Sequence, residues 1–136
     1  MIEVLIAIVL TTIGLVTLSS LQDTGWKSMA KADYVGRAAG ILHYTLEEYE
    51  ARIANPCYTP VPTGTQTLPP IQTSGGSTAI QGDVTYTVTV TITQIIWDPP
   101  GPESYLVTVK VVWPGNTTGI SESLEVSRQV SYIFGC

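Results

Sequence analysis

The residues that could carry enzymatic or metal chemistry are few and scattered along this chain. His43 is the only histidine, and no cysteine pair stands at the spacing of metal ligands. Serine, aspartate and histidine all occur, but no spacing links a nucleophile to a base as hydrolysis requires. Asp98 and Glu103 are too sparse a pair of carboxylates to predict a calcium site. We therefore expect no catalytic residue, no cofactor and no bound metal.

One carboxylate is notable because of its neighbours. Glu3 lies near the start of a run from Met1 to Leu21 that is otherwise almost wholly apolar. As a helix rising about 1.5 Å per residue, this run would cross a hydrocarbon layer of roughly 30 Å. A charge in such a span needs a cationic partner or a proton, unless it lies close enough to the lipid headgroups to stay hydrated.

A cleaved signal peptide is the alternative interpretation of the apolar run, and its flanks argue against it. A signal peptide has basic residues ahead of a shorter apolar core and small residues at its cleavage site. Here the first basic residue is Lys27, which lies beyond the run. The same absence of early basic residues leaves the orientation across a membrane undetermined.

Composition predicts a β-rich extracytoplasmic protein that does not have nucleic acid as its primary ligand. The net charge is −5 and only 12% of the residues are charged. The two cysteines, Cys57 and Cys136, suggest one disulfide formed in an oxidising compartment, the alternative being two free thiols. In the chain-entropy view, closing that loop of about 80 residues stabilises the fold by roughly 4–5 kcal/mol.

The apolar run continues without a break into an amphipathic helix. Asn55-Pro56 predicts the end of this helix, which would run from Ile2 to Ala54 and measure about 80 Å. Half of that length must project from a domain of this size. Residues 22–54 are expected to pack through an apolar stripe formed by Ala32, Val35, Ala39, Leu42, Leu46, Tyr49 and Ile53. Interface and core packing also account for the helical aromatic residues Trp26, Tyr34, Tyr44 and Tyr49.

The rest of the chain predicts a connecting loop at 55–83 and then an antiparallel sheet. A turn is expected at Asp98–Pro102. Three strands alternate apolar and polar residues. Their apolar faces comprise Val84, Tyr86, Val88, Val90 and Ile92; Tyr105, Val107, Val109, Val111 and Trp113; and, between Leu124 and Phe134, Leu124, Val126, Val130, Tyr132 and Phe134, with Arg128 interrupting the pattern. We predict an α+β fold with a helical part at 1–54 and a globular β domain at 55–136.

The N-terminal motif resembles that of type IV pilins and type II secretion pseudopilins, and its sequence is most similar to that of the PilV-like minor pilins. The residues that carry the resemblance are Ile2-Glu3-Val4-Leu5-Ile6-Ala7-Ile8, Ile13-Gly14-Leu15 and Leu21-Gln22. The motif covers only the first 22 residues. The expected architecture agrees over the whole chain: a long N-terminal helix, a Pro- and Gly-rich loop, an antiparallel sheet and a C-terminal disulfide.

The resemblance implies a role for Glu3 in assembly. In this family a prepilin peptidase removes a leader ending in glycine, the new amine is methylated, and a glutamate neutralises the amine of an adjacent subunit. Either a leader and two mature residues, one aromatic and one small and polar, precede Met1, or Met1 is the N-terminus in a different register. The family commonly has a proline inside this helix, so a melted segment here would depend on Gly14 and the hydroxyl residues of Thr11–Ser20. The assembly residues implied are Glu3, Ile2, Leu5, Ile6, Val9, Ile13 and Gly14.

The function expected from these features is that of a structural filament subunit. The chain would reside in the bacterial inner membrane before assembly. An assembly platform would then polymerise it into a helical homo-oligomer outside the cell or in the periplasm. Adhesion, motility or DNA uptake would follow. The alternatives are a type II secretion pseudopilin, which calcium in the loop region would favour, and a single-pass membrane-anchored binding module.

Overall fold

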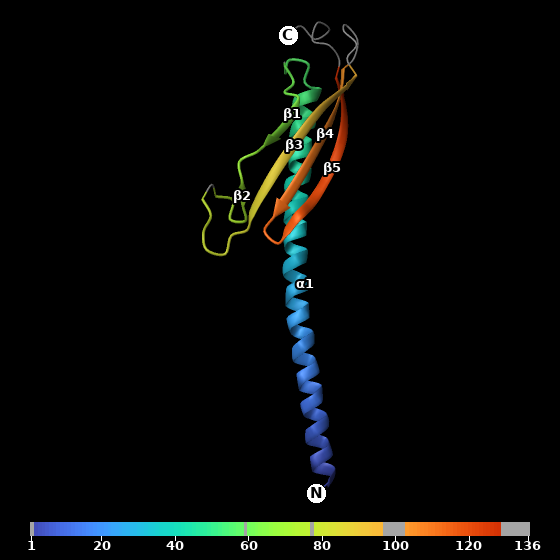
Figure 1. The fold of residues 1–136 in the computed structure, drawn as a ribbon, viewed down its shortest axis with the longest axis vertical. Helices are drawn as coiled ribbons and strands as arrows, with labels where there is room; N and C mark the ends of the chain where they lie inside the picture. The colour runs from blue at the N-terminus through green and yellow to red at the C-terminus, as the bar shows by residue number, and fades with distance from the viewer. Residues whose placement is uncertain (1, 59, 77, 97–102, 129–136) are drawn as a thin grey trace. The chain divides into compact units, whose positions relative to one another are not determined.

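The computed structural model describes residues 2–58, 60–76, 78–96 and 103–128 (Figure 1). The described elements are one helix followed by strands of an antiparallel sheet, which confirms the predicted α+β class. They are α1 (Ile2–Ala54), β1 (Gly64–Thr67), β2 (Ile71–Gln72), β3 (Thr85–Ile96), β4 (Glu103–Trp113) and β5 (Asn116–Arg128). The chain forms two compact parts, the N-terminal unit (Met1–Arg37) and the sheet unit (Ala38–Cys136).

Both predicted ends of the helix are confirmed, and a local turn explains the second. α1 ends at Ala54, and Asn55 then closes a turn through its side chain and its backbone. Its Oδ1 accepts a hydrogen bond from the Cys57 amide at 3.0 Å, and its carbonyl accepts one from the Tyr58 amide at 3.1 Å. Pro56 has no amide hydrogen to donate a helical hydrogen bond, so the helix ends before this turn.

The hydroxyl-rich stretch within Thr11–Ser20 is helical throughout. The Thr11, Thr12 and Ser19 hydroxyls donate to the carbonyls one turn earlier at 2.7, 2.7 and 2.9 Å. Thr17 donates to the carbonyl of Gly14 at 2.9 Å and to that of Ile13 at 3.1 Å. Such bonds satisfy the hydroxyls inside the helix itself.

The sheet has the order β1-β3-β4-β5, with β2 also paired to β3, and every pairing is antiparallel. The predicted succession of three long antiparallel strands is confirmed in β3, β4 and β5. The prediction that all of 55–83 is a connecting loop is wrong, because β1 and β2 lie within it. These short segments, GTQT and IQ, show no apolar alternation, so pairing with β3 rather than their own pattern makes them strands.

The last strand was predicted to begin at Leu124, and this start is wrong. β5 begins at Asn116, directly after the turn at Pro114-Gly115, and it pairs with β4 from there onward. The polar residues 116–123 show little apolar alternation, which is why the sequence did not reveal them as strand. The predicted turn at Asp98–Pro102 and the residues Val130, Tyr132 and Phe134 lie outside the described residues.

The core of the sheet unit lies between one face of the sheet and the last five turns of α1. The predicted inner faces of β3 and β4 are confirmed: Tyr86, Val88, Val90, Ile92 and the whole set from Tyr105 to Trp113 are buried, while Val84 is half-buried just before β3. The predicted helical stripe is only partly right. Burial begins at Ala38 and includes Leu42, Thr45, Leu46, Tyr49 and Ile53, whereas Ala32, Val35 and Ala39 are exposed.

Candidate assembly surface

The N-terminal unit carries its large apolar side chains on its surface. α1 is long and apolar enough to cross a membrane, with a mean hydropathy of 2.4 over its most apolar 18-residue window and none of that window buried. Five of the predicted assembly residues are 48–75% exposed: Ile2, Leu5, Ile6, Val9 and Ile13. Successive members lie three, one, three and four residues apart, which places all five on one stripe of the helix.

The other sides of the same helix are equally apolar and exposed. The side chains concerned are Val4, Ile8, Leu10, Leu15, Leu18 and Leu21. A helix that is apolar all round is normally found inside a protein core or a membrane. The described residues bury none of these side chains, so the N-terminal unit presents them at its surface.

Glu3 and Gly14 lie among these apolar side chains, Glu3 exposed and Gly14 half-buried. A Cβ placed on Gly14 would meet nothing within 4 Å, so no contact within the described chain requires glycine there. The structure therefore places all seven predicted assembly residues on the N-terminal unit, and the described residues bury none of them fully.

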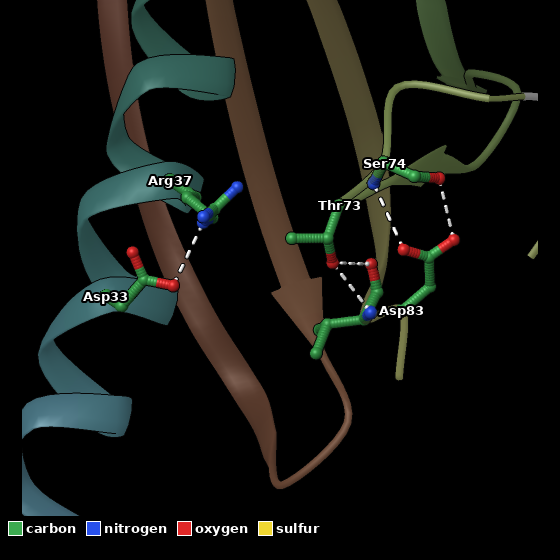
Figure 2. A network of polar contacts seen from close by, with 6 residues as sticks. Asp33, Arg37, Thr73, Ser74 and Asp83 are labelled. Atoms are coloured by element: carbon green, nitrogen blue, oxygen red, sulfur yellow. Dashed lines mark hydrogen bonds and ion pairs between the residues drawn. The ribbon is translucent and has the colours of Figure 1, made fainter. Parts of the chain in front are cut away.

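The polar half of the N-terminal unit neutralises two of its own cations. Lys27 Nζ lies 2.7 Å from Asp23 Oδ2, and Arg37 Nε lies 2.9 Å from Asp33 Oδ2 (Figure 2). Each aspartate lies one turn N-terminal to its partner, which is the favourable orientation on a helix. Both pairs are exposed, so each contributes only a few tenths of a kcal/mol.

Trp26 marks the boundary between the apolar and the charged parts of this unit. Its side chain is 72% exposed, and that of Tyr44 in the sheet unit is 68% exposed, so neither packs within the described chain. Of the four helical aromatics assigned to packing, Tyr49 alone is buried and Tyr34 is half-buried. The position of Trp26 beside Lys27, the first basic residue, is typical of an aromatic anchor at a membrane surface.

The sheet unit has an open groove of about 480 Å³ between α1 and β5. Its lining comprises Ala39, Gly40, Leu42, His43, Ile120, Ser121 and Glu122. His43 Nε2 lies 4.0 Å from Glu47 Oε1, and both side chains are exposed. Among the described residues, no three His, Cys, Asp or Glu side chains lie close enough together to hold a metal ion.

A buried ion pair joins the end of β5 to the start of β4. Arg128 Nε lies 3.3 Å from Glu103 Oε2, and the two side chains are only 5% and 15% exposed. That contact is electrostatic, because the geometry at Nε is not that of a hydrogen bond. Arg128 Nη1 donates a 2.7 Å hydrogen bond to the carbonyl of Tyr58, just after the helix. Arg128 therefore does not leave the strand pattern: it lies on the inner face beyond Leu124 and Val126.

Tyr105 completes this cluster. Its hydroxyl donates to Glu103 Oε2 at 2.8 Å and accepts a 3.4 Å hydrogen bond from Gln94 Nε2. Burial, the hydrogen bond to Glu103 and the charge of that carboxylate together raise the pKa of Tyr105 to about 12. A phenol with this pKa stays neutral and keeps donating to Glu103 at all physiological pH values, so it holds that carboxylate in place beside Arg128.

A second polar network closes the segment between β2 and β3 (Figure 2). The carboxylate of Asp83 accepts hydrogen bonds from the Ser74 amide at 3.1 Å, the Ser74 hydroxyl at 2.7 Å and the Ile80 amide at 3.0 Å. The Thr73 hydroxyl donates to the Val84 carbonyl and accepts from the Val84 amide. These donors, the Ile80 amide first, hold the pKa of Asp83 below its usual value.

Replacing Asp83 with alanine should loosen this loop. Because the pKa is lowered by folding, the carboxylate stabilises the loop fully above the ordinary aspartate pKa, and this effect disappears as the pH falls through the lowered pKa. At neutral pH we expect hydrogen exchange of the Ser74 and Ile80 amides to become several-fold faster in Asp83→Ala. In the wild-type chain their protection should fall only in strong acid. Equal exchange in Asp83→Ala and the wild-type chain at neutral pH would contradict this role.

The predicted disulfide stays a prediction. Cys57 is exposed and lies in the turn that follows α1. Cys136 lies outside the described residues.

Comparison with known proteins adds no family assignment. No protein-family model, curated protein or solved structure matches the chain.

Proposed function

We propose that this chain is a structural subunit of a type IV pilus-like filament that polymerises through its N-terminal helix. The observation that carries the proposal is the unit Met1–Arg37, whose large apolar side chains are exposed on every side. A filament in which such helices bundle would bury them against one another. The resemblance of the N-terminal motif to pilins and pseudopilins gives this polymer its class.

The same helix accounts for a membrane-bound pool before assembly. Its apolar length suits a hydrocarbon layer, and Trp26 with Lys27 suits the boundary of that layer. The proposed partners are therefore the inner membrane, further copies of this chain, and the prepilin peptidase and assembly platform of the machinery. Glu3 would take its countercharge from a neighbouring copy.

Imaging of sheared surface fibres tests the proposal. We expect bacteria that carry a pilus assembly system and express this chain to produce long fibres, and the helical reconstruction should contain this chain with residues 2–37 at the fibre axis. Short fibres confined to the periplasm would instead support a pseudopilin. Membrane-bound chain with no fibre in any assembly-competent host would contradict polymerisation and leave the anchored module.

Glu3→Ala should separate assembly from folding and from membrane binding. Removing a charge makes the span more apolar, so the variant should still fractionate with the membrane and keep its folded sheet unit. Fibre yield should fall by roughly tenfold or more, since the lost pairing in an apolar medium is worth at least about 1.4 kcal/mol.

The matched control is Glu50→Ala, which removes another exposed glutamate, from the part of α1 that belongs to the sheet unit. Fibre yield in this variant should equal that of the wild-type chain. Normal fibre yield from Glu3→Ala would rule out the pairing role.

A further inference from the structure

The basic side chains of the N-terminal unit are three, and two of them are neutralised inside it. Lys27 Nζ lies 2.7 Å from Asp23 Oδ2, and Arg37 Nε lies 2.9 Å from Asp33 Oδ2. The third, Lys31, is exposed and forms no ion pair with a described residue. The unit therefore presents one basic side chain whose charge is available to another molecule.

The sequence around Lys31 explains why its charge is not neutralised on the helix. Side chains three and four positions apart are neighbours on a helix surface. For Lys31 these positions hold Lys27, Ser28, Tyr34 and Val35, and none of these residues is acidic. The like charge of Lys27, one turn earlier, makes an anion from outside the helix more favourable for Lys31.

Glu3 is the matching anion of the same unit. The helical neighbours that follow it are Ile6 and Ala7, and neither carries a charge. Glu3 is exposed among apolar side chains, where a carboxylate without a cation is unfavourable. Glu3 and Lys31 cannot meet within one copy, because 28 residues of a continuous helix separate them by about 42 Å. A pair between them therefore has to join two copies.

The basic side chains of the sheet unit are less suited to Glu3. Arg52 and Arg128 already form ion pairs within that unit. Lys110 is exposed on β4, so it belongs to the sheet and not to the helix. In a bundle of N-terminal helices, Lys31 is therefore the basic side chain left for Glu3.

We propose that Lys31 of one copy is the countercharge of Glu3 in a neighbouring copy of the fibre. This inference rests on the proposed function, because it names the residue that pairs with Glu3 when the N-terminal helices bundle. Copies drawn from one membrane point the same way, so their helices are parallel. Pairing then shifts the two copies by about 42 Å along the helix axis, to within about one turn of 5.4 Å.

A contact of this kind continues from copy to copy. Each chain offers Glu3 to one neighbour and Lys31 to another, so the two patches in contact are different. Such heterologous contacts between parallel copies produce an open filament when the rotation between copies does not close into a ring.

The pair also gives Glu3 a reason to leave the membrane. In lipid its carboxyl group either binds a proton or stays near the hydrated headgroups. In the fibre the ammonium group of Lys31 lets the carboxylate remain ionised. The apolar stem of lysine can lie along the neighbouring helix while its charged end reaches Glu3.

A charge swap tests the pair in the full chain, expressed in bacteria that carry a pilus assembly system. Sheared fibres are quantified, and membrane fractionation and circular dichroism verify that each variant is inserted and folded. Lys31→Glu should lower the fibre yield by roughly tenfold or more, because it places two carboxylates against each other. The double variant Glu3→Lys/Lys31→Glu should return the yield to within about threefold of the wild-type chain, because the pair is restored with its charges exchanged.

Lys110→Glu is the matched control, because it makes the same change of charge at an exposed lysine of the sheet unit. Its fibre yield should equal that of the wild-type chain. An equal loss in Lys110→Glu and Lys31→Glu would reveal an effect of net charge and overturn the assignment. A double charge-swap variant that is folded and inserted but yields no more fibre than Lys31→Glu would also overturn it.

Helical reconstruction of wild-type fibres gives an independent measurement. We expect the carboxylate of Glu3 to lie within about 4 Å of Lys31 Nζ of a neighbouring copy. Fibres with residues 2–37 at their axis, but with another group beside Glu3, would overturn the pairing with Lys31 and leave the proposed function standing. The absence of any wild-type fibre would contradict polymerisation itself and this pairing with it.

Discussion

Arg128→Met should lower the free energy of unfolding of the sheet unit by about 3–5 kcal/mol. The substitution leaves Glu103, only 15% exposed, without its countercharge, and it leaves the Tyr58 carbonyl without its donor. Methionine nearly fills the same volume, so most of the loss reflects the stranded carboxylate. Guanidinium unfolding followed by circular dichroism measures the change.

Two comparisons separate the buried charge from the loss of a salt bridge in general. Arg52→Met breaks the exposed pair with Glu48 one turn earlier on α1 and should cost less than about 1 kcal/mol. The double variant Glu103→Leu/Arg128→Met should recover much of the stability lost in Arg128→Met, because no unpaired charge remains. A single Arg128→Met variant as stable as the wild-type chain would contradict the account of this cluster.

Gly119→Ala should destabilise the β4–β5 hairpin by about 3–5 kcal/mol. Gly119 has φ +67°, and a Cβ there would lie 2.2 Å from the carbonyl oxygen of Val111 and 2.7 Å from Cγ1 of Val112. The first of these atoms belongs to the backbone of the paired strand, so the strands themselves must separate. The left-handed conformation adds its own strain for any residue with a side chain.

Gly115→Ala is the matched control for this prediction. Gly115 also has a positive φ, +87°, in the same hairpin, but a Cβ there meets nothing within 4 Å. Gly115→Ala should therefore lower the free energy of unfolding by only about 1–2 kcal/mol, from backbone strain alone. Thermal unfolding of both variants gives the comparison, and equal losses would show that the contact with Val111 has no energetic weight.

Local patterns explain what could be predicted from the sequence. Asn55-Pro56 marked the C-terminal end of α1, the absence of an earlier proline left the helix uninterrupted, and strict alternation identified the inner faces of β3 and β4. β1 and β2 could not be predicted because their four and two residues become strands only when β3 is already beside them. The same holds for the polar start of β5, which follows β4 across a two-residue turn.

The sequence shows Arg128 as a charged residue in an alternating strand, but it does not show that its side chain lies on the inner face of the sheet. As one charged residue in an alternating strand it suggested an interruption, because its partners are distant in sequence. Glu103 is 25 positions earlier and Tyr58 is 70 positions earlier, and neither position is marked by any local pattern. The fold alone brings them together and makes the inner face suitable for a charge.

The candidate assembly surface was more accessible to sequence reasoning than the polar clusters were. The sequence alone shows an apolar run that contains one acidic residue, Glu3. All seven assembly residues predicted from this run lie on the N-terminal unit. The sequence does not show which aromatic residue lies at the boundary between the apolar and charged parts of this unit. Trp26 and Tyr49 both occur on the helix, and only their burial tells them apart.

The bonded hydroxyls of Thr11, Thr12, Thr17 and Ser19 alter how this helix responds to a change of surroundings. A threonine hydroxyl that already donates its proton to a carbonyl of its own helix needs no hydrogen-bond acceptor outside the helix. Moving the segment from lipid into protein therefore leaves its hydrogen bonds the same in number and kind. If the segment moves from lipid into a fibre, as we propose, its hydroxyl residues favour neither medium, and the preference between them depends on packing and on the charge of Glu3.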